Sequence, residues 1–273
     1  MAGWLTCMVV MAVAGRETTR ELNVLQVTEL RALIGLGMLY PVIQAAGGLG
    51  AMRTQHIWQH IGRNVVHYGA GACWLMALTL IPLAQVISLE FTMPIWTAVL
   101  AVTFLGERMG LWKNLAVVLG LVGVVVIVRP FTGSISVGQL IALAAAMGFA
   151  ISVIVVKVLT RTDRVAAILF WMLVIQSMMG LGPALYVWQA PSLHVWGWLL
   201  VMAFCGTYAH YCMTHALLHA DATVVVPMDF LRVPLAAVTG WLVYREGVDL
   251  FTVLGAALIL GGNLLNLRGS GRR

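Results

Sequence analysis

Residues Ala77–Arg129 read ALTLIPLAQVISLEFTMPIWTAVLAVTFLGERMGLWKNLAVVLGLVGVVVIVR, which is two long apolar segments joined by the short charged turn GERMGLWKN. The same pattern returns 139 residues later, so that Gly123 matches Gly262 and Glu90 matches Asp229. Each of the two matched carboxylates lies inside an apolar run. An internal repeat is interpreted before any single segment, because it determines the architecture of the whole chain.

The composition is that of a protein whose solvent is lipid. The chain has 273 residues, of which 61% are hydrophobic and 10% charged, and its mean hydropathy is +0.96. A soluble domain carries about 25% charged residues. The net charge of +6 comes from scattered Lys and Arg residues and not from one basic face, which argues against nucleic-acid binding. The four cysteines form no CxxC pair, and we expect them to be small buried apolar residues.

Apolar stretches of about 20 residues can cross the ~30 Å hydrocarbon core as helices. Ten segments are predicted, at residues 2–15, 26–46, 64–81, 83–105, 111–129, 137–158, 165–188, 195–217, 222–243 and 249–267. The first contains an apolar run of only 13 residues, with no positively charged region before it. The segment therefore does not resemble a signal peptide. It is either a helix cut short by a late start site, with its natural start upstream of Met1, or a half-length helix, and the late start is favoured.

The links are short, and their charges indicate an orientation. With the N-terminus inside, the inner links and the tail hold ten Lys and Arg residues, whereas the outer links hold four. Positive charges concentrate on the cytoplasmic side, so both termini are expected there. The longest link, Gly47–Arg63, carries His56 and His60 four residues apart. No Cys or carboxylate is near in sequence, so a solvated or headgroup-facing surface is favoured over a metal site.

The repeat predicts the fold class. Each copy covers five helices, and an odd number of crossings makes the second copy enter from the opposite side of the membrane. We therefore expect an all-α integral membrane protein with ten transmembrane helices in two inverted five-helix repeats. The predicted organisation is a first repeat at 1–130, a second at 137–268 and a basic cytoplasmic tail at 269–273, which suits anionic lipid. Inverted repeats are a common architecture of secondary transporters.

Several motifs resemble the EamA type of the drug/metabolite transporter superfamily. In the first half they are ELRALIGLGMLYP, WLMALTLIPLAQVISLEFTMPIWTAVLAVTFLGE and LWKNLAVVLGLVGVVVIVRP; in the second they are HALLHADATVVVPMDFLRVP and YREGVDLFTVLGAALILGGNLL. The resemblance covers nearly the whole chain. It implies a ten-helix carrier of the bacterial inner membrane, with both termini inside and a central cavity lined by helices of both halves. The short first helix and the charged PMDFLRVP depart from the family pattern.

Glu90, Asp229 and Arg232 are the sharpest candidates for solute or proton binding. Ionisable groups at membrane depth cost roughly 2.5–3.5 kcal/mol each on insertion scales, so each needs a reason. Glu90 has no cation within one turn and is a candidate for proton exchange, because burial raises a carboxyl pKa. Asp229 has Arg232 three residues later on the same helix face. The alternatives are a structural ion pair for Asp229 and Arg232, and a bond to a neighbouring helix for Glu90.

Three prolines accompany these acids. Pro94 cannot donate to the carbonyl of Glu90, and Pro227 and Pro234 flank the second acid. Both helices are expected to kink there. Freed carbonyls at membrane depth are tolerated where protein or cavity water satisfies them.

A second candidate group consists of Arg31 and aromatic or imidazole side chains. Arg31 could bind substrate, reach the interface or pair across helices. The remaining candidates recur loosely in the two halves, where they could stack on a planar solute or pack as an interface belt; they are His67, Tyr68, Trp74, His210, Tyr211 and His215.

The function predicted is transport of a small metabolite or drug-like solute, by export with proton coupling. The alternatives are uptake of a vitamin- or nucleoside-like solute, and a channel or scaffold. No GxSxG, HExxH or phosphate-binding glycine loop is present, which argues against an enzyme. The expected partners are a small molecule, the bilayer and a proton, with no cofactor, metal or nucleic acid. The sequence does not indicate an oligomeric state.

Overall fold

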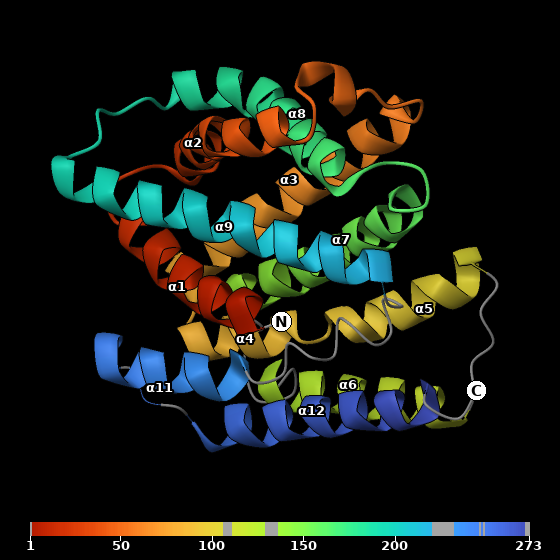
Figure 1. The fold of residues 1–273 in the computed structure, drawn as a ribbon. Coiled ribbons are helices and arrows are strands. Elements are labelled where there is room, and N and C mark those ends of the chain that lie inside the picture. The colour runs from red at the N-terminus through yellow and green to blue at the C-terminus, as the bar shows by residue number, and fades with distance from the viewer. Residues whose placement is uncertain are drawn as a thin grey trace. The chain divides into compact units, whose positions relative to one another are not determined.

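A computed structural model describes residues 2–105, 111–128, 136–219, 232–245, 247 and 249–270 (Figure 1). Those residues form helices and connecting turns, with no strand among them, as the all-α prediction requires. In chain order the elements are α1 (Ala2–Thr19), α2 (Val24–Ala45), the short 3-10 helix η1 (Leu49–Met52), α3 (Ile57–Leu80), α4 (Leu83–Glu90), α5 (Met93–Leu105), α6 (Leu111–Val128), α7 (Val137–Leu159), α8 (Val165–Tyr186), α9 (Leu193–His219), α11 (Arg232–Tyr244) and α12 (Leu250–Ser270).

The first helix extends beyond the predicted segment 2–15 at its C-terminal end. α1 has 18 residues and continues to Thr19. The hydroxyls of Thr18 and Thr19 both donate to the carbonyl of Gly15, each at 2.9 Å. These bonds satisfy the two hydroxyls within the last turns of the helix. Hydropathy alone ended the segment too early, because it does not register such local bonds.

The third helix begins at Ile57, earlier than predicted. The hydroxyl of Thr54 accepts from the backbone N–H of His56 at 3.0 Å, and the carbonyl of His56 accepts the N–H of His60 at 3.2 Å. This cap starts the helix inside the stretch that hydropathy assigned to a link. Arg63 is therefore helical and 5% exposed, and it does not belong to the link.

The predicted segment 83–105 consists of two helices, α4 and α5, with an interruption at Phe91 and Thr92. Pro94 has no N–H to donate to the carbonyl of Glu90. The carbonyl of Thr92 instead accepts from Ile95 at 2.9 Å and starts the new helix. The predicted segment 222–243 is described from Arg232 onward, and its earlier part lies outside the described residues.

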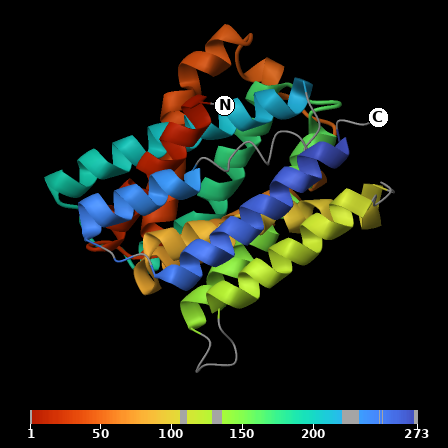
Figure 2. The same ribbon diagram turned by 90° about the horizontal axis from the view of Figure 1, so that it is seen from below.

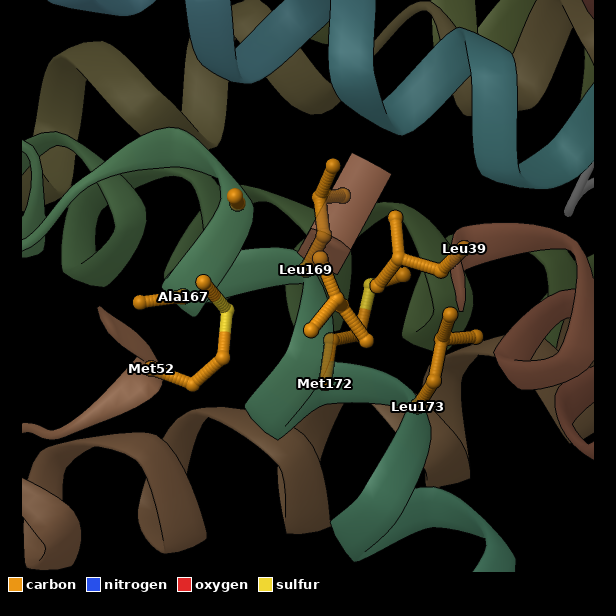
Figure 3. Packing of buried hydrophobic residues seen from close by; sticks show 8 residues of the cluster. Leu39, Met52, Ala167, Leu169, Met172 and Leu173 are labelled. Carbon is orange, nitrogen blue, oxygen red and sulfur yellow. The ribbon is translucent and has the colours of Figure 1, made fainter. Parts of the chain in front are cut away.

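The chain divides into two compact units, each of which draws helices from both halves of the sequence. Unit 1 comprises residues 1–75 and 155–219, and it contains α1, α2, most of α3, α8 and α9. Within it α1 packs on α9, and α2 packs on α8. An apolar cluster where α2 and η1 meet α8 holds one end of the unit together (Figure 3). Its labelled members are Leu39, Met52, Ala167, Leu169, Met172 and Leu173.

The helices α2 and α8 run antiparallel. Glu29 lies against Gly180, Arg31 bonds to Gln176, and Gly35 faces Leu173, so that positions rise along α2 as they fall along α8.

Unit 2 comprises residues 76–154 and 220–273. Its most extensive helix pair is α6 with α12, which lie side by side in Figures 1 and 2. A Cβ atom on Gly123 would lie 2.7 Å from the carbonyl oxygen of Gly255, and one on Gly255 would lie 2.6 Å from that of Gly123. Gly123 also faces Ile259 whereas Gly255 faces Ile127, so these helices are antiparallel too. The prediction that small residues near position 123 allow close helix contact is confirmed.

Judged by length and composition alone, two of the described helices, α7 and α8, are long and apolar enough to cross a membrane. Shorter apolar stretches occupy Val118–Ile127 in α6 and Leu250–Gly262 in α12. The helix α2, which carries Glu29 and Arg31, is not among them. Ten membrane crossings therefore stay a prediction.

Candidate functional site

Polar side chains converge inside unit 1, where α2, α3, α8 and α9 meet. We name this group the polar cluster, and its members are buried or half-buried. It consists of Glu29, Arg31, Arg63, Asn64, His67, Tyr68, Gln176, Ser177 and His210.

Local sequence signals position α2 within this group. The side chain of Asn23 caps the helix by accepting from the N–H of Leu25 at 3.0 Å, so that Glu29 and Arg31 fall in its second turn. The helix ends where Gly47 and Gly48 adopt φ of 107° and 75°, which residues with a side chain rarely adopt.

Two buried arginines are joined by two amides. Arg31 donates from Nη2 to Oε1 of Gln176 at 3.1 Å, and Gln176 donates from Nε2 to Oδ1 of Asn64 at 3.2 Å. Arg63 donates from Nη1 to the same Oδ1 at 2.8 Å, and Asn64 donates from Nδ2 to the carbonyl of His60 at 2.8 Å. The amides thus link three helices and orient both guanidinium groups.

A buried carboxylate lies one turn away. Glu29 is 1% exposed, and no group of the described residues bonds to either of its carboxylate oxygens. The hydroxyls of Tyr68 and Ser177 are also buried without a hydrogen-bond partner among those residues. A Cβ atom on Gly180 would meet both Oε2 of Glu29 and the hydroxyl of Tyr68. Glycine at this position therefore leaves room for the two groups.

Two imidazole rings meet beside the arginines. His67 of α3 and His210 of α9 have ring centroids 4.9 Å apart in an edge-to-face arrangement, and Trp4 of α1 lies 6.4 Å from His210. These histidines were predicted as loosely matched members of the two repeats. The structure brings them into contact.

A carboxylate at one end of unit 1 ties two links together. Asp163, between α7 and α8, accepts from Nε2 of His60 at 2.7 Å and from the hydroxyl of Thr54 at 2.6 Å. Burial raises the pKa of Asp163, but these hydrogen bonds outweigh it and hold the pKa below its usual value. The prediction of a solvated surface is wrong for His60, whose side chain is 1% exposed, because Asp163 supplies it with a partner from a distant part of the chain.

The opposite end of α2 is tied in a similar way. Glu21 accepts from the backbone N–H of Ser192 at 2.6 Å and from its hydroxyl at 2.8 Å, and both bonds lower the pKa of the carboxyl. Gln26 exchanges two hydrogen bonds with the backbone of Gln189, at 2.6 and 3.0 Å. Links at both ends of the α2 and α8 pair are thus joined by side chains.

The predicted candidates around the end of α4 and the start of α11 belong to unit 2. Glu90 is the last residue of α4, is 4% exposed and precedes the helix break. Pro94 lies in the first turn of α5. Asp229 and Pro227 lie outside the described residues, as do the side chains of Arg232 and Pro234, whose backbone begins α11.

The other candidates fall into two groups. Arg31, His67, Tyr68 and His210 are members of the polar cluster, and Trp74 is buried two turns beyond His67 on α3. Tyr211 and His215 lie on an exposed face of α9, with ring centroids 5.8 Å apart, and the structure does not bring them to the cluster.

Sequence reasoning missed Glu29, Arg63, Asn64, Gln176 and Ser177. Gln176 gives a usable signal, because an amide in the middle of the apolar segment 165–188 needs a partner. Arg63 and Asn64 gave none, since hydropathy had assigned the first to a link and the second to a helix end.

Unit 2 carries an apolar hollow of about 440 Å³ on α6 and α12. Its lining residues, which include Val126, Phe251 and Leu254, are apolar, and Phe251 and Leu254 are each 48% exposed. Such a hollow suits a lipid chain rather than a polar solute.

Comparison with protein-family models matches the EamA-like transporter family over residues 2–129 and 136–268. Among curated proteins, the chain is 33% identical over 227 residues to a riboflavin transporter of Rhizobium johnstonii, covering 83% of this chain and 75% of the relative. A riboflavin transporter of Brucella anthropi is 30% identical over 242 residues, which is 86% of this chain and 85% of that protein.

A pseudopaline exporter of Pseudomonas aeruginosa is 27% identical over 250 residues, covering 90% of this chain and 86% of the relative. One solved crystal structure is similar with a TM-score of 0.74 at 17% identity, over 99% of this chain and 96% of that one. The structural similarity concerns the fold alone.

Proposed function

The chain belongs to the EamA-like transporter family, and from this premise we propose that it carries a small polar metabolite across the membrane by alternating access. The observation that carries this proposal is the polar cluster, in which amides, arginines and a carboxylate are buried among apolar helices. Such groups at membrane depth are costly and mark solute or proton pathways. The matched family and the named relatives are transporters, so the chain is assigned to transport and not to enzymatic catalysis.

The proposed topology is ten membrane-spanning helices in two inverted repeats, at 1–130 and 137–268, followed by a short basic tail. The antiparallel pairs α2 with α8 and α6 with α12 support it, because each pair joins corresponding helices of the two halves. The contact of His67 with His210 supports it as well. We assign the chain to a bacterial inner membrane with both termini cytoplasmic, because Lys and Arg residues are in excess on the inner side, nine to four when the buried helical Arg63 is left out.

We propose export as the direction and a proton as the coupling ion, with Glu90 as its carrier. Glu90 is buried at the end of α4, beside the helix break. Asp229 and Arg232 stay candidates for the corresponding position of the second repeat.

A second candidate function is uptake of riboflavin. Its support is the identity of 33% and 30% to two riboflavin transporters over more than four-fifths of this chain. A channel or scaffold gains no such support.

The test is a profile of solutes inside cells and in the medium. Cells expressing the wild type are compared with cells expressing Arg31→Gln, Glu90→Gln and the control Arg53→Gln, all at matched abundance in the membrane. Arg53 is an exposed arginine of the link before α3, so its variant matches the loss of charge outside the cluster. Riboflavin added to the medium tests the second candidate.

We expect the wild type and Arg53→Gln to redistribute one solute and Arg31→Gln to lose this activity. Accumulation in the medium indicates export, and accumulation in the cell indicates uptake. Glu90→Gln is expected to abolish transport driven by a pH gradient. Absence of any redistributed solute with the wild type contradicts the proposed function, and full activity of Arg31→Gln moves the site away from the polar cluster.

A further inference from the structure

The polar cluster contains two charged levels about one helical turn apart. The helices α3 and α8 run parallel through it, because Asn64 bonds to Gln176 and, four residues later on each helix, Tyr68 lies against Gly180. Four residues of helix correspond to a rise of about 6 Å. On the antiparallel α2, Arg31 lies at the first level, and Glu29, only two residues and a rise of about 3 Å away, reaches the second.

The first level presents two guanidinium groups with neutral partners. Arg31 and Arg63 bond to amide oxygens, and no carboxylate of the described residues lies within 4.0 Å of either. Nε of Arg63 has no hydrogen-bond partner among those residues. Guanidinium groups bind carboxylate or phosphate oxygens with two parallel hydrogen bonds. This level therefore suits an anionic group.

The second level suits a cationic group. Both carboxylate oxygens of Glu29 and the hydroxyl of Tyr68 are buried and have no hydrogen-bond partner among the described residues. A buried polar group without a partner is destabilising, and a carboxylate is satisfied by a cation with N–H donors. The two imidazole rings of the cluster, His67 and His210, contact each other and cannot carry negative charge. Glu29 is thus the carboxylate of the cluster.

We propose that the polar cluster binds a zwitterionic solute, with its anionic group between Arg31 and Arg63 and its cationic group at Glu29. The inference rests on the proposed transport function and adds the charge class of the solute. The separation of the two levels favours a solute whose opposite charges lie within about one helical turn of each other.

The first step of the test is the charge class of the solute that the wild type redistributes. The second step uses three probes: this solute, its N-acetyl derivative, which lacks the cation, and its methyl ester, which lacks the anion. Each competes with the labelled solute for transport by the wild type, Glu29→Gln, Arg63→Gln and the control Arg53→Gln. Arg63→Lys and Glu29→Asp keep the charge and control for loss of structure.

We expect the wild type and Arg53→Gln to prefer the zwitterion over either derivative by about tenfold or more in half-inhibitory concentration, the loss of one charge-assisted hydrogen bond. Glu29→Gln is expected to lose the preference over the N-acetyl derivative only. Arg63→Gln is expected to lose the preference over the methyl ester only. Arg63→Lys and Glu29→Asp should each keep part of the preference.

Three results overturn the inference. If the wild type carries a neutral or singly charged solute, such as riboflavin, the transport function stands and the charge class is wrong. A second result is that Glu29→Gln and Arg63→Gln lose inhibition by all three probes equally, while Glu29→Asp and Arg63→Lys restore none of it. In that case the two charges serve the structure alone. If the wild type redistributes no solute, the proposed function fails and the inference fails with it.

Discussion

Replacing Gly255 by alanine tests the close contact of α6 and α12. The new Cβ would lie 2.6 Å from the carbonyl oxygen of Gly123 and against Ile127. The carbonyl belongs to helix backbone and cannot rotate away, so the helices must separate by several tenths of an ångström. Overpacking of this kind costs about 1–3 kcal/mol.

Gly261→Ala is the matched control on the same helix. A Cβ atom there would meet nothing within 4 Å. Both variants gain alanine's helix propensity, which is about 1 kcal/mol relative to glycine, so the propensity cancels in the comparison. The remaining difference is the overpacking cost, and it corresponds to a Tm lower by roughly 3–10 °C for Gly255→Ala.

The assay is thermal unfolding of the two purified variants in the same detergent, followed through the fluorescence of the buried tryptophans. Gly123→Ala should behave like Gly255→Ala, and the double variant should cost less than the sum because the two glycines share one contact. Equal Tm values for Gly255→Ala and Gly261→Ala would refute the antiparallel contact at these glycines.

Two further substitutions probe unit 1. Asp163→Asn should lower the free energy of unfolding by roughly 1.5–3 kcal/mol at neutral pH, since it removes the charge that strengthens the buried hydrogen bonds from His60 and Thr54. The folded-state pKa of Asp163 lies below the usual 3.8, so this difference should persist down to about that pH and disappear as the pH falls further; a difference that vanishes by pH 6 would contradict it. Gly180→Ala, whose Cβ would lie 3.0 Å from the hydroxyl oxygen of Tyr68 and against Glu29, should reduce transport, whereas Gly182→Ala, with nothing within 4 Å, should not; equal rates would place the solute elsewhere.

The sequence by itself determined the helical class, the family and most helix positions. These follow from hydropathy and spacing, which are properties of neighbouring residues. It also indicated the repeat, because Gly123 and Glu90 have partners 139 residues later. The predicted helix boundaries were wrong at the end of α1 and the start of α3. Thr18 and Thr54 form short-range hydrogen bonds there, which hydropathy does not detect.

Only the tertiary structure decided which polar groups meet. Arg31, Gln176 and Asn64 come from three helices, and their bonds span 145 and 112 residues of sequence. The sequence predicted a solvated side chain for His60, but in the structure it bonds to Asp163, 103 residues away. A buried polar side chain is satisfied by whichever group the packed helices bring near it, and no local pattern specifies that group. The paired arginines and the carboxylate one turn away are therefore features of the fold and not of any segment.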